Sequence, residues 1–297
     1  MARLGSVLWA LSCVLILVAR AVGSLIHSPL LAYSTEGDIY VRDLGYDLTL
    51  QLTFDGQRYM DESPAWSPAW SPAGQALVFT RRLGSPYSAD DPDTDIYWMA
   101  LDGSRRVRLT DNDVNDSVPS WSPDGIWIAY LSAAQTGHQV KLIAPEQSES
   151  QAKILPISLP QRLHTTLKWT PDGSRLFLHA LDGILVLPMA FDLADQTLTP
   201  LSDHEAYYPA PSPSGNQTAV LVPTRGGHAL TVLTPDVSSR LLTDSLPPRV
   251  GVVWEDEAHL LYLSEDLKAI LRVNVQTGQT TEAYRFANHV MSFAILP

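Results

Sequence analysis

The sequence predicts an all-β fold, a six-bladed β-propeller built from four-stranded antiparallel blades. Three observations lead to this prediction: a tryptophan and turn phrase that recurs along the chain, short β-type runs after each copy, and two chain ends that supply complementary parts of one further unit. A phrase that returns at intervals of about 40 to 55 residues is typical of repeat architectures, because a single unit cannot bury its own apolar face.

The recurring phrase has a physical meaning in each copy. It reads PAWSPAWSPAG at 64–74, PSWSPDG at 119–125 and LKWTPDG at 167–173. Proline presets φ, aspartate bonds nearby backbone and glycine tolerates unusual dihedrals, so the phrase predicts a tight turn. The tryptophan before the turn is a large apolar anchor that we expect to pack between blades. In the doubled first copy, either Trp66 or Trp70 holds this position.

Each turn is followed by short runs of strand-forming residues. The three clear copies precede apolar runs at 76–79, 127–130 and 175–178. Two weaker copies, at 211–215 and 254–257, precede similar runs at 218–222 and 259–263. A third run follows in every copy, and a fourth often ends in Leu-Thr, which gives the four short strands typical of a propeller blade.

The two ends of the chain predict the sixth blade. Residues 290–295 have the pattern of a first strand with nothing after it, whereas 30–34 and 38–41 have the pattern of later strands without a first one. Pairing of the two ends closes the ring and removes an exposed sheet edge. We therefore expect one propeller domain over residues 24–297.

The N-terminal segment, residues 1–23, has a different character. Arg3 is followed by an apolar run over 4–19, and Ala19-Arg20-Ala21 offers small residues at positions that a signal peptidase reads. These features predict export, to the periplasm or another extracytoplasmic space. The alternatives are a cleaved signal peptide or a retained membrane anchor, which would contact the bilayer through residues 4–19.

Composition narrows the classes of function. The chain has 32 acidic against 20 basic side chains, a surplus of negative charge that argues against nucleic acid as a partner. Its single cysteine, Cys13, lies in the N-terminal segment, so the propeller has no thiolate nucleophile, thiolate metal site or disulfide. The strong sequence motifs of hydrolases, zinc proteases and nucleotide-binding proteins are absent. Nothing therefore predicts an enzyme or a required cofactor.

The residues just ahead of each tryptophan are the candidates for a ligand site. In a propeller the first strand of each blade is innermost, so positions four to six residues before the tryptophan are expected at one mouth of the central channel. Imidazoles and carboxylates among them suit a divalent ion such as Mn²⁺ or Zn²⁺, and Asp116, His164, His204 and His289 are the candidate metal ligands. The alternative is simple solvation of a wet channel mouth. The full candidate set is Glu62, Asp116, His164, His204, Glu205, Arg249 and His289.

Tyr207 and Tyr208 lie close in the sequence to two of these residues, His204 and Glu205. Because of this position, we expect them to be exposed aromatic side chains at the channel mouth. The tryptophans at 70, 121, 169 and 254 recur at equivalent repeat positions, and we expect all four to be core residues.

The turn phrase at 121–125, with Ile-Ala-Tyr at 128–130 and Ile-Tyr at 96–97, resembles the TolB-type, WD-like propeller repeat. The resemblance is close over about residues 62–180 and weaker beyond them. It implies a six-bladed propeller that we expect to be monomeric and to act as an interaction platform for a protein or peptide partner in the cell envelope. In TolB an α/β domain precedes the propeller, and because only a short segment precedes Leu30 here, we expect this chain to lack that domain. The alternative function is a metal-dependent lyase or hydrolase, or a carbohydrate-binding propeller, that uses the central channel.

Overall fold

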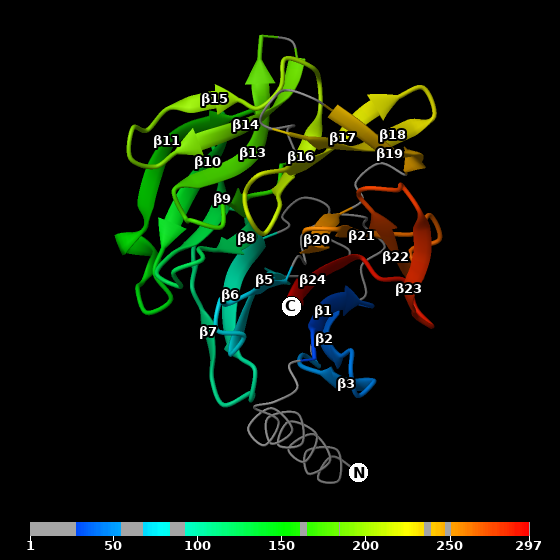
Figure 1. The fold of residues 1–297 in the computed structure, drawn as a ribbon. Coiled ribbons are helices and arrows are strands. Elements are labelled where there is room, and N and C mark those ends of the chain that lie inside the picture. Colours follow the sequence, from blue (N-terminus) through cyan, green and yellow to red (C-terminus); the bar gives the residue numbers. More distant parts are fainter. Residues whose placement is uncertain are drawn as a thin grey trace.

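The computed structural model describes residues 28–54, 68–83, 93–160, 165–183, 185–234, 239–246 and 251–296. They form six four-stranded antiparallel sheets arranged as the blades of a propeller (Figure 1). The predicted fold class is therefore confirmed. The predicted signal or anchor segment at 1–23 lies outside the described residues. Within them, no helix is long and apolar enough to cross a bilayer.

We number the blades 1 to 6 along the chain, starting with the blade that contains both chain ends. The first strand of each blade in sheet order lies beside the first strand of the next blade, and this chain of contacts returns from blade 6 to blade 1. The first strands are therefore innermost, as the sequence predicts. Blade 1 contains β24 (Ser292–Leu296), β1 (Leu30–Thr35), β2 (Asp38–Asp43) and β3 (Leu48–Gln51); blade 2 contains β4 (Ala69–Trp70), β5 (Ala76–Leu83), β6 (Asp93–Ala100) and β7 (Arg106–Arg108).

The remaining four blades follow the same order of strands. Blade 3 also contains a short 3₁₀ turn, Glu149–Gln151, ahead of its last strand. Blade 3 contains β8 (Asp116–Trp121), β9 (Ile128–Ala134), β10 (Gly137–Ile143) and β11 (Lys153–Leu159); blade 4 contains β12 (Lys168–Trp169), β13 (Arg175–Asp182), β14 (Leu185–Asp192) and β15 (Leu198–Pro200). Blade 5 contains β16 (Tyr207–Pro211), β17 (Thr218–Thr224), β18 (Gly227–Leu233) and β19 (Ser239–Leu246); blade 6 contains β20 (Val252–Asp256), β21 (His259–Leu263), β22 (Ala269–Asn274) and β23 (Thr280–Arg285).

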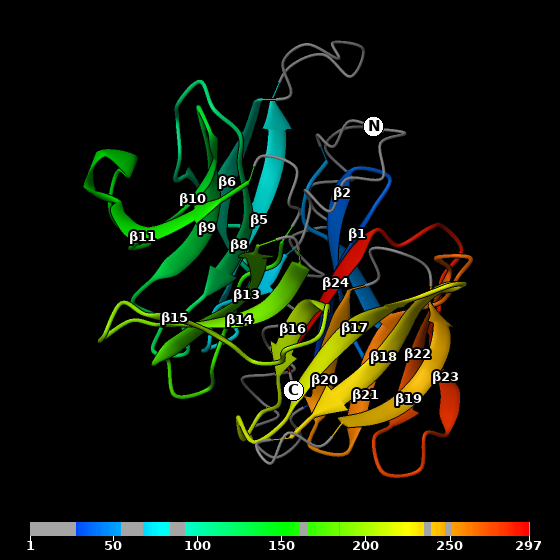
Figure 2. The ribbon, with the colours of Figure 1, turned by 90° about the horizontal axis from the view of Figure 1, so that it is seen from above.

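Blade 1 is completed by both ends of the chain, as predicted. Strand β24 pairs antiparallel with β1, with Ala294 opposite Ala32. Figure 2 shows the C-terminal strand lying beside the N-terminal one. The hydroxyl groups of Ser34 and Ser292 also share a hydrogen bond of 2.7 Å. This pairing closes the ring.

The recurring phrase forms the turn between the first and second strands of a blade. In blade 3 the Gly125 N–H donates to Ser122 O (3.0 Å), and the Trp127 N–H donates to Ser122 Oγ (2.9 Å). Ser122 Oγ in turn donates to Asp124 Oδ1 (2.5 Å). Gly125 has φ +75°, a value that favours glycine. The residues of this turn thus satisfy one another's hydrogen-bonding groups, which explains why they recur together.

These turns gather on one face of the ring, which we call the turn face. The proline of each clear turn faces the glycine of the turn in the next blade. A Cβ atom placed on that glycine would lie 3.6–3.9 Å from the proline Cδ, for the pairs Pro72 with Gly125, Pro123 with Gly173 and Pro171 with Gly215. The structure also settles the doubled first copy. Strand β4 ends at Trp70 and the turn begins at Ser71, so Trp70 is the equivalent residue and Trp66 is not.

Three of the four tryptophans connect neighbouring blades as predicted. Trp70, Trp169 and Trp254 are buried, and each Nε1–H donates to a carbonyl oxygen on the first strand of the preceding blade. The acceptors are Ala294 O (3.2 Å), Ser120 O (3.0 Å) and Ala210 O (2.9 Å), respectively. Trp121 is the exception, because it is only half-buried and donates to Gly125 O within its own turn (3.2 Å).

Candidate functional site

The structure describes four of the seven candidate channel residues. Glu62, His164 and Arg249 lie outside the described residues. With Trp70 as the repeat tryptophan, Glu62 stands eight positions ahead of it in the sequence, not four to six. Of the remaining four, which are Asp116, His204, Glu205 and His289, Asp116 is fully buried, while His204 and His289 are exposed.

Asp116 begins β8 and belongs to a buried polar network. Asn112 Nδ2 donates to Asp116 Oδ2 (2.8 Å) and also to Glu149, so this amide joins the two carboxylates. Lys141 Nζ lies 3.5 Å from Glu149 Oε1. Burial raises the pKa of Asp116 to about 6, and the negative charge of Glu149 adds to the increase. Asp116 is therefore part of the interior of blade 3, with a carboxyl group that titrates in the weakly acidic range.

This raised pKa predicts a dependence of stability on pH. Because the folded state binds the Asp116 proton more tightly than the unfolded state, the free energy of unfolding should fall as the pH rises from about 4 to about 6, by on the order of 2 kcal/mol. Asp116→Asn should remove this fall. Urea unfolding between pH 4 and pH 7 measures it, with Asp113→Asn, an exposed neighbour, as the control that keeps the fall. An identical slope in Asp116→Asn would contradict the assignment.

His204 and Glu205 lie where blades 4 and 5 meet, a region that we call the seam. The His204 side chain is 83% exposed, and its Nδ1 contacts the Asp203 carboxylate. Glu205 Oε1 accepts a hydrogen bond of 2.5 Å from the Tyr207 hydroxyl. Burial and this contact with Glu205 raise the pKa of Tyr207 to about 12, so the phenol keeps its proton at neutral pH. Tyr207 and Tyr208 are half-buried, less open than the sequence predicts.

Two histidines that the sequence reasoning missed complete an aromatic cluster around Tyr207. Its ring meets His179 of β13 and His228 of β18 edge-to-face, with centroid distances of 5.5 and 5.6 Å. His179 is buried, and its Nδ1 accepts the Tyr208 backbone N–H (3.2 Å). Because that N–H can only donate, the ring proton of a neutral His179 must be on Nε2. Burial lowers the pKa of His228.

A bulge in β16 brings Tyr208 to His179. The pairing of β16 with β17 shifts between Tyr207 and Ala210, and Tyr208 has φ +54° immediately before Pro209. Positive φ is unusual for an aromatic residue, and such backbone is retained where the surrounding structure fixes it. Strand β8 has the same bulge, with Val118 at φ +54° before Pro119. One sequence feature that could have indicated His179 is its repeat position, nine residues after the turn residue Thr170, where two other copies have Leu131 and Leu221 and the first has Thr80.

A groove of about 610 Å³ lies in the seam. Its lining includes Phe177 of blade 4 and Val220 and Thr231 of blade 5. His204, which precedes β16 in the chain, and Asn216, which follows it, also line the groove. The four hydrophobic core clusters of the described residues join blades 1 and 2, blades 2 and 3, blades 3 and 4, and blades 5, 6 and 1. None of these clusters contains side chains of both blade 4 and blade 5. The seam is therefore a place where a groove and an aromatic cluster replace continuous apolar packing.

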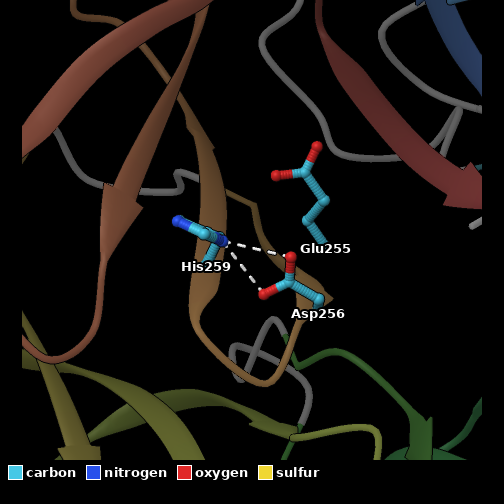
Figure 3. Close-up of side chains that lie close together, drawn as sticks. All are labelled: Glu255, Asp256 and His259. Carbon is cyan, nitrogen blue, oxygen red and sulfur yellow. Dashed lines mark hydrogen bonds and ion pairs between the residues drawn. The ribbon is translucent and has the colours of Figure 1, made fainter.

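A different group has the ligand types that a metal ion needs. Glu255, Asp256 and His259 place one ligand atom each within 4.8 Å of one another, at the β20–β21 hairpin (Figure 3). His259 Nδ1 pairs with both Asp256 oxygens, at 3.0 and 3.1 Å, while Glu255 forms two bonds of 2.5 Å with Arg272. Arg272 already balances the charge of Glu255, and His259 already occupies Asp256 through hydrogen bonds. None of the predicted metal ligands belongs to it, and no other group of three ligand side chains is this close within the described part of the chain.

Comparison with known proteins agrees with the architecture. A family model described as the TolB β-propeller domain matches residues 34–245. The structure of TolB from Acinetobacter baumannii aligns with 93% of this chain and 70% of its own, at 15% identity and a TM-score of 0.72. A putative TolB from Agrobacterium tumefaciens aligns with 91% of this chain and 99% of its own, at 14% identity and a TM-score of 0.62.

A chain from a complex of nidogen with laminin has the same fold. It aligns with 90% of this chain and 98% of its own, at 12% identity and a TM-score of 0.64. A search of curated protein sequences finds no match. At these identities the solved structures show a shared fold, whereas the family model, which spans more than half of the chain, shows shared family sequence features.

Proposed function

The chain belongs to the TolB β-propeller family, and from this premise we propose that it is an exported, monomeric propeller that binds a protein or peptide partner in the cell envelope. We propose the seam between blades 4 and 5 as the docking surface. The observation that carries this proposal is the groove of about 610 Å³, which adjoins the candidate residues His204 and Glu205.

The chemistry of the seam favours recognition over catalysis. Tyr207 keeps its proton and donates to Glu205, and burial lowers the pKa of His228 so that its imidazole is neutral at pH 7. Both groups are therefore uncharged at neutral pH and available as hydrogen-bonding and aromatic contacts for a partner. Tyr207 follows Ala206, which lines the groove, and a half-buried tyrosine at such a place is the kind of anchor that protein interfaces favour.

Export and partner type have separate support. The apolar run over 4–19 after Arg3 has the pattern of a signal peptide or anchor. A chain of similar fold is part of a nidogen–laminin complex, so this architecture also occurs in a complex between proteins. Because folds host many functions, this likeness supports the class of partner and not its identity.

Photo-crosslinking in the cells that make the chain tests the docking surface. p-Benzoylphenylalanine in place of His204 or Asn216 places a reactive group at each of these exposed positions in the groove. We expect both variants to give the same crosslinked partner. Replacement of Thr277, an exposed turn residue of blade 6, is the control and should give no such product.

Two results would contradict the proposal. Equal labelling from Thr277, or no labelling from either seam position, would exclude the seam as the docking surface. A melting temperature that falls when EDTA is added to the purified chain would instead favour the metal-dependent alternative, with Asp116, His164, His204 and His289 as its predicted ligands.

A further inference from the structure

We propose that a second groove, on the turn face between blades 2 and 3, binds a cationic peptide segment bearing arginine or lysine. We call it the Trp groove. It measures about 830 Å³, and the residues that matter for the argument are Pro72, Trp98, Leu101, Asp102, Trp121 and Asp124. The inference rests on the proposed function, because it gives the chemistry of a segment of the partner protein.

The orientation of Trp121 is the first observation. The equivalent tryptophans 70, 169 and 254 are buried and bonded to the preceding blade. By the same rule Trp121 would donate to Ala69 O of blade 2, the residue before Trp70. It donates instead to Gly125 O of its own turn and lines the Trp groove. Its indole therefore packs on the edge of the core cluster of blades 2 and 3 and keeps part of its surface open to the groove, whereas the other three are buried.

Trp98 shows that the site suits a guanidinium group. The Arg105 guanidinium carbon lies 5.3 Å from the centroid of the Trp98 ring. The same guanidinium bonds to both oxygens of Glu146, at 3.3 and 3.2 Å. An indole and a carboxylate thus hold one arginine within the chain, next to the groove that Trp98 lines. Cation–π attraction combined with an ion pair is favourable at such partly desolvated sites.

The charge of the groove complements a cation. Asp102 and Asp124 line it, and no lysine, arginine or histidine of the described residues does. Hydrogen bonds from Ser104 lower the pKa of Asp102, and those from Ser122 and Ile126 lower the pKa of Asp124, so both are ionised at neutral pH. In both aspartates it is Oδ1 that accepts these hydrogen bonds. The whole chain also carries a net charge of −12, which attracts basic segments from a distance.

The apolar part of the groove favours an arginine or lysine side chain over a small cation. Pro72, Ala73 and Leu101 line it together with the two indoles. The aliphatic stem of lysine or arginine packs on such a surface while its charged head reaches a carboxylate. A neutral sugar would use the indoles but would gain nothing from the ionised aspartates.

Titration of the purified chain with synthetic peptides tests the inference. The probe is acetyl-Leu-Arg-Ala-Arg-Leu-amide, with glutamine and glutamate versions as charge controls. We expect the arginine peptide to shift the indole N–H resonances of Trp98 and Trp121 in ¹H–¹⁵N spectra, and the other two peptides to shift neither. Binding should also weaken as salt is added, because the attraction is between charges near the surface.

The chain offers a matched pair of variants. Asp124 and Asp172 both accept a hydroxyl two residues before them and a backbone N–H two residues after them, and Asp172 also accepts the Ser174 hydroxyl, but of the two only Asp124 lines the Trp groove. Asp124→Asn should weaken binding of the arginine peptide about 3- to 10-fold, whereas Asp172→Asn should leave it unchanged.

Three results would overturn the inference. The first is that the glutamine peptide binds as tightly as the arginine peptide. The second is that Asp124→Asn and Asp172→Asn weaken binding of the arginine peptide equally. The third is that a neutral oligosaccharide such as cellohexaose shifts the indole resonances and the arginine peptide does not. The titration uses purified protein and a defined peptide, so its failure leaves the seam crosslinks unaffected. Loss of the crosslinks would likewise leave the titration unaffected, and the two proposals can fail separately.

Discussion

A chain that ends at Met291 is expected to lose the cooperative unfolding transition of the propeller. Such a chain lacks β24, which pairs with β1 and supplies Phe293 and Ile295 to the core. Burial of these two side chains and the backbone bonds of the pairing together contribute on the order of 10 kcal/mol, comparable to the whole stability of a domain. Trp70 would also lose its acceptor, Ala294 O. The measurement is urea unfolding followed by tryptophan fluorescence and circular dichroism.

Complementation provides the control for this truncation. A synthetic peptide of residues 287–297 added to the shortened chain should restore the transition in a concentration-dependent way, and a scrambled peptide should not. A shortened chain that unfolds with the midpoint and slope of the full chain would show that the two ends do not close the ring.

Trp169→Ala is expected to lower the free energy of unfolding by about 3 to 5 kcal/mol, as for other large core side chains. Trp169 is 8% exposed, packs in the cluster shared by blades 3 and 4, and donates to Ser120 O. The substitution leaves a cavity between blades and a buried carbonyl without its donor.

Trp121→Ala is the matched comparison for Trp169→Ala. Trp121 occupies the same repeat position but is half-buried and bonded within its own turn, so its loss should cost about 1 to 2 kcal/mol. Chemical denaturation of both variants measures the difference. Equal losses of stability would mean that Trp121 is a core residue like the others, which would also remove the main support for the Trp groove.

The architecture could be predicted from the sequence because the repeat depends on local chemistry. The Ser-Pro-Asp-Gly turn satisfies its own hydrogen bonds, so its residues appear wherever the turn does. Blade 1, which both chain ends complete, also followed from the pattern, since 290–295 lacked partners that 30–34 could supply. Blade 6 shows the limit of the pattern. The turn after Trp254, between β20 and β21, is built on Asp256. The turn in which a serine hydroxyl donates to an aspartate two residues later lies instead between β21 and β22, at Ser264–Asp266.

The candidate site could be predicted only in part. Counting back from the repeat position that tryptophan holds in other blades, and Pro211 in blade 5, identified His204 and Glu205, which lie at the seam. The same counting gave no indication of His179 and His228, which meet Tyr207 from two different blades. Contacts of this kind depend on how one blade faces the next, and the repeat pattern describes each blade separately.

The sequence by itself determined the fold class, the number of blades and the closure of the ring, because turns, strand alternation and tryptophan anchors are properties of local segments. Only the tertiary structure decided that Trp70 and not Trp66 is the anchor, that Asp116 is buried, that Trp121 is half-buried and bonds within its own turn, and that blades 4 and 5 meet across a groove. These outcomes depend on packing between residues distant in the chain, where burial and the available partners are fixed by the closed ring as a whole.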